Sequence, residues 1–324
     1  MNITITGGSG FLGKKLAERL LAANELVGED GASSAVENLT LLDVVDPPEE
    51  LKNDPRVTVL TGDITDRALL EKAIPQSTDS IFHLAAIVSA GAEEDFDLGM
   101  SVNLDATRDI LEICRGNRTK PIVVFASSCA GFGGDMPRII EDMTARTPQT
   151  SYGTQKVIGE LLVNDYSRKG FIDGRALRFP TVVVRPGKPN KAASTFASSI
   201  IREPLQGQTA ICPVAPESKM FLASPRSIVQ NIVHAHNLTA NKWGFPRETT
   251  LPGFTMSIGD MAEALRVFAG NEVANLIQWE PDPFIQEIVN GWPPEFDTRK
   301  AKDLGFIQDT SMEAVIQAFI DDEL

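Results

Sequence analysis

The chain has 324 residues, with 30 lysines and arginines against 44 aspartates and glutamates, and a formal net charge of −14. Such an acidic chain is poorly suited to DNA, RNA or an anionic membrane surface, so we expect none of these as its main partner. Its three cysteines are widely spaced and form no C-x-x-C pair, which favours a reducing, cytoplasmic setting without disulfides. The sequence shows no secretory signal and no run of about 18 apolar residues, so we expect neither export nor membrane insertion.

Short β-rich runs alternate with helical patterns through the first half of the chain. The apolar strands are nearly continuous, as expected when helices cover both faces of a parallel sheet. This alternation predicts an α/β fold, a doubly wound parallel sheet of the Rossmann type. The predicted strands are residues 3–6, 39–43, 57–60, 80–84 and 122–126. The predicted helices are residues 11–23, 67–74, 101–115 and 150–169.

The pattern changes after Val184, where a turn-rich stretch leads into mixed helices and loops rich in proline. No linker separates the two halves, so the second half is expected to pack on the sheet and complete a cleft. We predict a Rossmann domain over residues 1–184 and a smaller mixed α/β part, mainly substrate-binding, over residues 185–324. The polar stretch 28–38 is predicted to be a surface insertion before the second strand.

A glycine-rich turn follows the first predicted strand directly. Its glycines allow a tight turn, a close approach of the backbone to a pyrophosphate, and close packing of a helix on a strand. The next helix points its first N–H groups at such a phosphate. A lone glycine pattern is weak evidence, but this one stands between a strand and an amphipathic helix, so it predicts a dinucleotide site. The candidate residues of the turn are Gly7, Gly10, Phe11, Leu12 and Gly13.

Acidic residues follow the second and third strands. A carboxylate at Asp43 accepts hydrogen bonds from the ribose hydroxyls of adenosine and repels a 2′-phosphate, so it favours NAD over NADP. The alternative is a solvent-facing carboxylate at a strand end. Asp63, which Ile64 follows, is predicted beside the adenine, whereas Asp66 is predicted to cap the next helix.

Tyr152 and Lys156 lie four residues apart on a predicted helix, so their side chains share a face. Tyrosine is a poor base at its usual pKa of about 10, but a nearby ammonium and a positive nicotinamide ring favour the tyrosinate. Alone, Y-x-x-x-K is common on solvated helix faces. Here it follows a buried strand that ends in Ser127 and Ser128, and a serine hydroxyl there can hydrogen-bond a substrate oxygen while hydride moves. The set predicts an NAD-dependent dehydrogenase.

These motifs together resemble the extended short-chain dehydrogenase/reductase family, which holds the NAD-dependent epimerases and dehydratases. The similarity covers roughly residues 1–185 and includes the runs His83-Leu84-Ala85-Ala86 and Phe125-Ala126-Ser127-Ser128. It implies that Tyr152 is the catalytic acid/base, that Lys156 lowers its pKa and holds the nicotinamide ribose, and that Ser128 is the catalytic serine. It also implies a homodimer formed through two packed helices. Further cofactor contacts implied by the resemblance are Leu84, Ala85, Ala86, Asn103, Pro180 and Val182.

Segments around residues 150–156, 178–181, 185–190 and 202–205 are similar to a branch of the family that oxidises the C2 hydroxyl of D-erythronate to the 2-keto acid. The resemblance implies a small anionic sugar acid as the substrate. Its carboxylate requires a guanidinium or ammonium, and its hydroxyls require small polar groups. The alternative role of Arg185 is to pin a loop. The substrate candidates are Ser89, Ser127, Ser128, Tyr152, Arg185, Asn190, Thr195 and Arg226.

Two other functions stay open. A sugar-nucleotide epimerase or dehydratase with tightly bound NAD uses the same tyrosine and lysine, but it needs a large pocket for a nucleotide diphosphate. A sensor that binds NAD without turnover usually lacks one of the three catalytic residues. No metal site is predicted, because His83 lies inside an apolar strand and His234 and His236 are two apart on a predicted helix, so they do not share a face.

Overall fold

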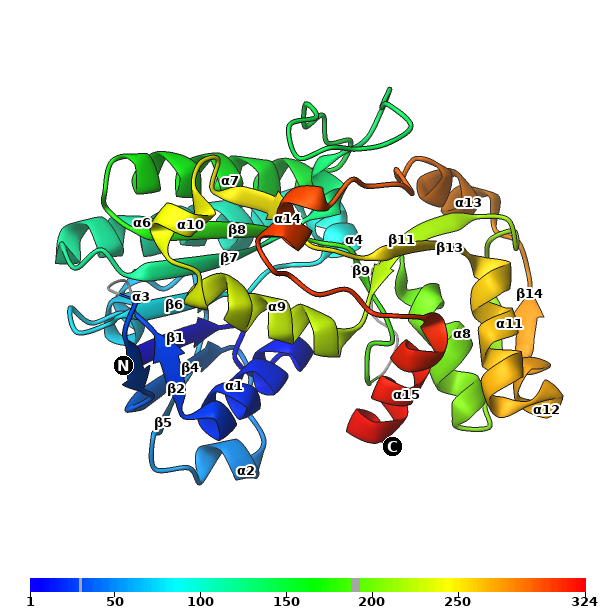
Figure 1. The fold of residues 1–324 in the computed structure, drawn as a ribbon, viewed down its shortest axis with the longest axis horizontal. Coiled ribbons are helices and arrows are strands. Elements are labelled where there is room, and N and C mark those ends of the chain that lie inside the picture. Colours follow the sequence, from blue (N-terminus) through cyan, green and yellow to red (C-terminus); the bar gives the residue numbers. More distant parts are fainter. Residues whose placement is uncertain (29–30, 188–192) are drawn as a thin grey trace.

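A sheet of seven parallel strands forms the centre of the computed structural model, which describes residues 1–28, 31–187 and 193–324. The strand order is β12-β8-β7-β6-β1-β4-β5, and every neighbouring pair is parallel (Figure 1). The predicted doubly wound sheet is therefore confirmed. The strands are β1 (Asn2–Thr6), β4 (Asn38–Asp43), β5 (Val57–Thr61), β6 (Ser80–His83), β7 (Ile122–Ser128), β8 (Asp173–Phe179) and β12 (Glu248–Thr250).

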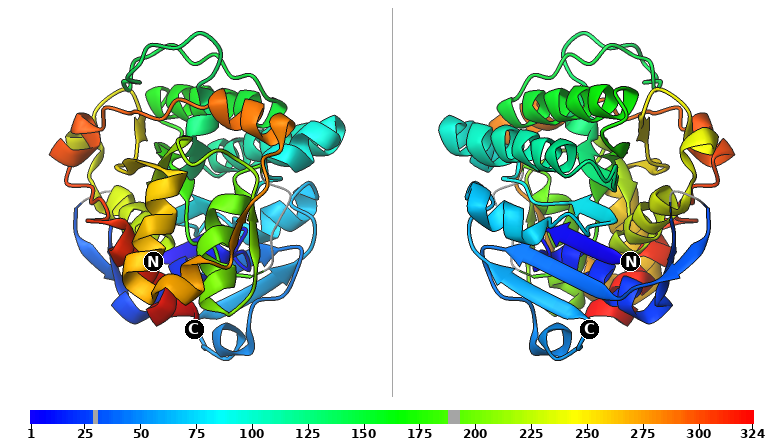
Figure 2. Two further views of the ribbon diagram at one scale, coloured as in Figure 1. Left: turned by 90° about the vertical axis from the view of Figure 1, so that its right-hand side faces the viewer. Right: turned by 90° about the vertical axis from the view of Figure 1, so that its left-hand side faces the viewer.

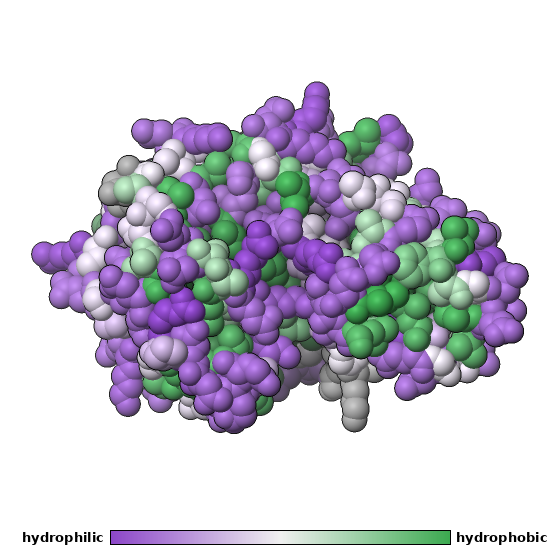
Figure 3. All heavy atoms as spheres, turned by 60° about the horizontal axis from the view of Figure 1, so that its bottom comes forward, coloured by the Kyte–Doolittle hydropathy of each residue, from purple (hydrophilic) through white to green (hydrophobic). Residues whose placement is uncertain are grey.

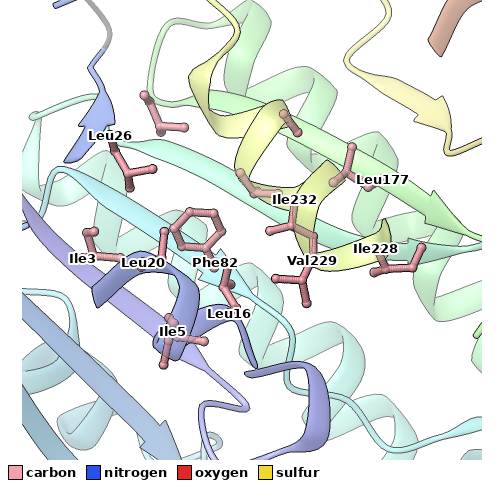
Figure 4. Close-up of a cluster of buried hydrophobic side chains, with 14 of the residues drawn as sticks. Ile3, Ile5, Leu16, Leu20, Leu26, Phe82, Leu177, Ile228, Val229 and Ile232 are labelled. Atoms are coloured by element: carbon pink, nitrogen blue, oxygen red, sulfur yellow. The ribbon is translucent and has the colours of Figure 1, made fainter. Parts of the chain in front are cut away.

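Helices cover both faces of this sheet (Figures 1 and 2). Successive side chains of a strand point to opposite faces, so Phe82 of β6 joins one hydrophobic cluster and Ile81 joins the other. Figure 4 shows the Phe82 cluster, in which Leu20 and Ile232 reach the sheet from two different helices. The helices of that face are α1 (Phe11–Ala23) and α9 (Pro225–Asn237). Those of the other face are α3 (Arg67–Ala73), α6 (Ala106–Asn117) and α7 (Ser151–Arg168).

A third hydrophobic cluster lies beyond the sheet and is built mainly from the second half of the chain, at the right of Figure 1. It joins β11 and β13 of the three-stranded sheet β13-β11-β9 to several helices, which include α8, α11 and α15. Because α9 and β12 belong to the central layers, the second half of the chain is interleaved with the first. The elements of this part are β9 (Thr181–Val182), α8 (Thr195–Leu205), β10 (Ala210–Cys212), β11 (Lys219–Ala223), β13 (Phe254–Ser257), α11 (Ile258–Ala269), β14 (Ile277–Trp279) and α15 (Met312–Glu323).

Short elements complete the fold. The predicted insertion over residues 28–38 contains β3, which pairs antiparallel with β2 directly before the insertion. The helix predicted over 101–115 begins as a π-helix that α6 continues. No helix in the described ranges is long and apolar enough to cross a membrane. The short elements are β2 (Glu25–Val27), β3 (Ser33–Ala35), α2 (Glu49–Lys52), α4 (Ser89–Glu94), α5 (Phe96–Gly99), η1 (Met100–Asp105), η2 (Cys129–Gly131), α10 (Ala240–Trp243), α12 (Asn271–Ala274), α13 (Pro283–Asn290) and α14 (Arg299–Asp303).

Two local predictions are confirmed. The side chain of Asp66 caps α3, where it accepts hydrogen bonds from the N–H groups of Ala68 and Leu69. His83 is a buried core residue whose ring nitrogens are hydrogen-bonded to Thr6 and Thr107 at 2.7 and 2.8 Å. Burial lowers the pKa of His83 to about 3, so the ring is neutral at physiological pH.

The surface keeps hydrophobic side chains as well. Figure 3 shows them gathered on the side of the molecule that holds the third cluster, whereas most of the same view is hydrophilic. Val267 of α11 is 71% exposed, whereas Val229 of α9 is 4% exposed inside the Phe82 cluster. The two valines therefore occupy helix positions that differ mainly in burial.

Replacing Val229 by alanine is expected to lower the free energy of unfolding by about 2 kcal/mol, because it removes buried methyl groups and leaves a cavity. The matched Val267→Ala variant is expected to stay within about 0.5 kcal/mol of the unmodified protein. Equilibrium urea denaturation of the two variants measures the difference. Equal losses in both would contradict the placement of α9 on the sheet.

Candidate active site

The predicted site residues fall at the carboxyl edge of the central sheet. The strand order reverses at β1, which has β4 on one side and β6 on the other. In open α/β sheets, ligands bind outside the carboxyl ends of the strands at such a point. Gly7 follows β1, Leu84 follows β6 and Ser128 ends β7.

The glycine turn packs too closely for side chains at two positions. A Cβ atom on Gly7 would lie 2.8 Å from the backbone nitrogen of Ala85, and its φ of +72° is one that favours glycine. A Cβ atom on Gly13 would lie 2.1 Å from the carbonyl oxygen of Gly7. Helix α1 begins after Gly10, which has no side chain to cap it, so N–H groups of its first turn are available to an anion.

Asp43 stands beside this turn. Its carboxylate accepts hydrogen bonds from the backbone N–H groups of Ser9 at 3.0 Å and Val44 at 2.7 Å. Within the part of the chain that the structure describes, the hydroxyl of Ser9 is buried and has no hydrogen-bond partner. Asp63 lies in the loop after β5, where it is exposed, and its carboxylate accepts a hydrogen bond from the backbone N–H group of Thr65. Ile64, beside Asp63, is buried.

A close backbone contact brings Tyr152 to Ser128. Helix α7 is capped by Thr150, and Tyr152 lies in its first turn. A Cβ atom on Gly153 would lie 2.2 Å from the carbonyl oxygen of Ala130, so only glycine lets this turn lie against the chain after β7. The hydroxyl of Ser128 consequently lies close enough to Tyr152 to lower the pKa of the tyrosine.

Burial and charge act in opposite directions on the two titratable groups. Burial raises the pKa of Tyr152 to about 12, while the Ser128 hydrogen bond and the charge of Arg185 lower it. Burial lowers the pKa of Lys156 to about 8, while the charge of Glu160 raises it. The Lys156 Nζ atom lies 5.6 Å from the centre of the Tyr152 ring. The sequence predicted one cation, Lys156, near the tyrosine, and in the structure the charge of Arg185 also acts on it.

Arg185 is fixed by its neighbours. Its Nε atom donates to the carbonyl of Val182 at 3.1 Å, and its Nη2 atom donates to the hydroxyl of Ser194 at 2.7 Å. Its backbone N–H donates to the hydroxyl of Ser198, and its carbonyl accepts from Arg202. Arg185 therefore pins a loop and also holds a guanidinium close to Tyr152.

Two other substrate candidates begin helices. Ser89 and Thr195 are half-buried first residues of α4 and α8. Asn190 lies outside the described residues.

Two substrate candidates have partners within the protein itself. Ser127 is buried and its hydroxyl donates to Glu160 at 2.5 Å, because neighbouring residues of a strand point to opposite faces and only Ser128 faces Tyr152. The guanidinium of Arg226 forms ion pairs with Asp321 and Asp322 of α15.

Asn103 connects two segments of the site by hydrogen bonds. This buried residue lies in the π-helix, and its amide exchanges two hydrogen bonds with the backbone of Ile87. Its Nδ2 atom also donates to the Oε1 atom of Gln155 at 2.7 Å. The residue therefore ties the loop after β6, which contains Ala85 and Ala86, to the catalytic helix. Pro180, between β8 and β9, is buried, and Val182 of β9 is half-buried.

Sequence reasoning missed a buried ion pair beneath these residues. Arg178 of β8 and Glu160 of α7 are 0% and 1% exposed at their side chains, with 2.9 Å between Nη2 and Oε2. The available signals were an arginine inside an apolar strand and a glutamate one turn after Lys156. Neither signal indicates which residue forms the other half of the ion pair.

Residues 3–219 match the model of the NAD dependent epimerase/dehydratase family. The chain belongs to this family. NAD is accordingly its cofactor. The bare glycine turn, the uncapped start of α1, the partnerless Ser9 hydroxyl and the adjacent Asp43 fit a dinucleotide.

Three similar proteins span almost the whole chain. A D-erythronate dehydrogenase from Cupriavidus necator is 52% identical and covers 99% of this chain and 98% of its own. A D-erythronate dehydrogenase from Haemophilus influenzae is 47% identical, with 99% of each chain covered. The crystal structure of a nucleoside-diphosphate-sugar epimerase from Agrobacterium tumefaciens is 43% identical, with a TM-score of 0.94 over 100% of this chain and 94% of its own.

Replacing Gly13 by alanine is expected to weaken NAD binding about 10- to 100-fold, because the new methyl group must push the glycine turn away by a backbone shift that costs about 1–3 kcal/mol. The matched Gly116→Ala variant places a methyl group on the exposed end of α6, where no described atom outside the neighbouring backbone of that helix lies within 4 Å. Its affinity is expected to stay unchanged. Calorimetric titration with NADH compares the two, and equal affinities would refute the cofactor site.

Proposed function

We propose that this enzyme oxidises the C2 hydroxyl of a short sugar acid, D-erythronate before others, to the 2-keto acid. One observation carries the proposal: the fixed guanidinium of Arg185 lies close enough to Tyr152 to lower its pKa. In a 2-hydroxy acid, the carboxylate is bonded directly to the reacting carbon, so its cationic anchor must stand beside the acid/base group. A sugar nucleotide carries its charges on a diphosphate, several bonds away from its ring hydroxyls. The two full-length relatives named D-erythronate dehydrogenase support the same choice.

In the proposed mechanism, Tyr152 acts as the base. The Tyr152 oxygen takes the proton of the C2 hydroxyl, and Ser128 donates a hydrogen bond to that substrate oxygen. Bound NAD supplies the hydride acceptor for C2. Burial opposes the tyrosinate, and the Ser128 hydroxyl and the positive charge of Arg185 favour it. The oxygen of C2 thus becomes a carbonyl as its proton leaves to Tyr152.

The proposed cofactor contacts follow the placement of the residues. Gly7, Gly10, Phe11, Leu12 and Gly13 would hold the pyrophosphate against the start of α1. The remaining assignments are Asp43 to the adenosine ribose, Asp63 and Ile64 to the adenine, Lys156 to the nicotinamide ribose, and Leu84, Ala85, Ala86, Asn103, Pro180 and Val182 to the nicotinamide side of the cleft, with Asn103 acting through its loop.

We also propose a homodimer, a cytoplasmic setting and a division of labour between the two parts of the chain. Leu161 on α7 and Phe96 on α5 are 52% and 58% exposed, which a partner subunit would cover. The three cysteines are free thiols, as in proteins of reducing compartments. Residues 1–184 would bind NAD and carry the catalytic groups, and residues 185–324 would mainly bind substrate.

The first test measures NADH formation with NAD and a panel of four- and five-carbon sugar acids. D-erythronate is expected to give the fastest turnover. Tyr152→Phe is expected to abolish turnover and to retain NAD binding, because it removes only the hydroxyl that takes the proton. The chain has two tyrosines, both on α7, so Tyr166→Phe is a matched control that should stay active. Turnover by Tyr152→Phe would refute the mechanism.

The same panel distinguishes sugar-acid oxidation from a second candidate function, that of a sugar-nucleotide epimerase. The similarity to the nucleoside-diphosphate-sugar epimerase from Agrobacterium tumefaciens favours a sugar-nucleotide epimerase. If no sugar acid reduces NAD while NAD binds, and a UDP-sugar is epimerised, the epimerase is correct. If NAD binds and neither class reacts, the protein is a non-catalytic sensor.

Replacing Arg185 by lysine is expected to raise the KM for the sugar acid about 10- to 100-fold, because a carboxylate loses a charge-assisted hydrogen bond worth about 1.5–3 kcal/mol. The affinity for NAD is expected to stay the same. Arg226→Lys serves as the control, because Arg226 is engaged by α15. Steady-state kinetics at saturating NAD give both values, and similar KM values for the two variants would exclude Arg185 as the anchor.

A further inference from the structure

Glu160 lies at the meeting point of three elements of the active site. It stands one turn after Lys156 on α7, and its side chain is 1% exposed. Its Oε1 atom accepts from the Ser127 hydroxyl at 2.5 Å and from the Arg178 Nε atom at 3.0 Å. Its Oε2 atom accepts from Arg178 Nη2 at 2.9 Å and from Arg146 Nη1 at 3.0 Å. The three partner residues come from β7, β8 and the loop before α7.

The Ser127 contact matters because Ser127 precedes Ser128. One carboxylate therefore ties the end of β7, which presents Ser128, to the helix that presents Tyr152 and Lys156. Arg178 pairs with Ser127 across the β7–β8 ladder and binds the same carboxylate from the next strand. A shift of α7 along the sheet would break hydrogen bonds to both strands, so the separation of Ser128 and Tyr152 is fixed from beneath.

Further charges surround this carboxylate. Arg146 also pairs with Glu248 at 2.7 Å, and Arg178 lies 3.5 Å from Glu248 and 3.7 Å from Asp142. The positive charge of Lys300 interacts with Asp142 and Glu248 as well. Glu160, Glu248 and Asp142 thus face Arg178, Arg146 and Lys300, an equal number of each sign. Removing the charge of Glu160 leaves a positive excess beneath Lys156.

We propose that Glu160, oriented by Ser127 and Arg178, is a positioning residue that sets the separation of Ser128 from Tyr152 and holds the positive charge on Lys156. The proposal rests on the roles proposed above for Tyr152, Lys156 and Ser128. It goes beyond them by assigning a function to a carboxylate that contacts neither substrate nor cofactor.

The surroundings of Lys156 support the electrostatic part. Its Nζ atom lies 4.9 Å from the centre of the Phe125 ring on β7, and His83 of β6 is neutral behind that ring. Tyr152 faces it from its own helix, and the charge of Arg185 acts on the pKa of that tyrosine. The negative charge that opposes the effect of burial on the pKa of Lys156 is that of Glu160. Without it, Lys156 would lose its proton at lower pH.

The chain offers a matched control in a second buried ion pair on β8. Asp173 and Arg175 are each 1% exposed, with 2.9 Å between them. Arg175 contacts Trp243 and the carbonyl of Leu238, which belong to the face of the sheet opposite α7. Asp173→Asn therefore removes an equally buried carboxylate charge without touching the Lys156 surroundings.

The experiment compares Glu160→Gln, Ser127→Ala and Asp173→Asn in sugar-acid oxidation over a range of pH. Glu160→Gln is expected to lower kcat about 10- to 100-fold, as misplacement of a catalytic group does, with the KM for NAD unchanged. Because the pKa of Lys156 falls, the alkaline decline of kcat/KM should begin at lower pH. Ser127→Ala should lower kcat in the same way without moving the alkaline limb, and Ser127→Thr should restore it. Asp173→Asn should reduce stability and leave kcat and the pH profile unchanged.

The outcomes separate this inference from the proposed function. If Glu160→Gln keeps the unmodified pH profile while Tyr152→Phe is inactive, the inference fails and the proposed function stands. If Ser127→Ala and Asp173→Asn lose activity in parallel with their stability, the role of the network is structural only and the inference also fails. If Tyr152→Phe is active, the proposed function itself fails. If Glu160→Gln does not fold, the Ser127 variants test the inference. A loss of kcat in Ser127→Ala that Ser127→Thr restores would support it, and an unchanged kcat in Ser127→Ala would refute it.

Discussion

The site depends on one close contact, that between the first turn of α7 and the chain that leaves β7. Glycine at 153 permits it, because any Cβ atom there would overlap the carbonyl oxygen of Ala130. The contact places Tyr152 against Ser128, and the helical repeat then places Lys156 and Glu160 at successive turns of the same face. The position of the acid/base group is therefore set by backbone packing before any charge is considered.

That packing has an electrostatic cost, which the rest of the site offsets. Burial opposes both the tyrosinate and the ammonium form of Lys156, so each is accompanied by an opposite charge or a hydrogen bond. Buried ion pairs contribute little net stability, since desolvation consumes most of the attraction. Two of them on one strand, at Arg175 and Arg178, are better explained by the geometry that they impose on their neighbours.

The local parts of this arrangement could be predicted from the sequence, and the long-range parts could not. Apolar periodicity located the strands of the first half and the helix of Tyr152, and three glycines located the turn after β1. The proximity of Arg185 to Tyr152, and the pairing of Arg178 with Glu160, depend on how separate elements pack. The strand period of two already required Ser127 and Ser128 to point apart, although it did not say which of them faces the tyrosine.

The same scaffold also explains how one family serves unlike substrates. The carboxyl edge of the sheet carries the glycine turn, the proposed base and the proposed serine, whereas the groups beyond β9 come from the second half of the chain. In the proposed function, a small acid is distinguished from a sugar nucleotide by a second cation near the base, the guanidinium of Arg185. Here that cation is close to Tyr152, and it is fixed by Val182 and Ser194 before a substrate arrives. A preorganised guanidinium next to the base favours a carboxylate on the carbon beside the reacting hydroxyl, and it offers nothing comparable to a distant diphosphate.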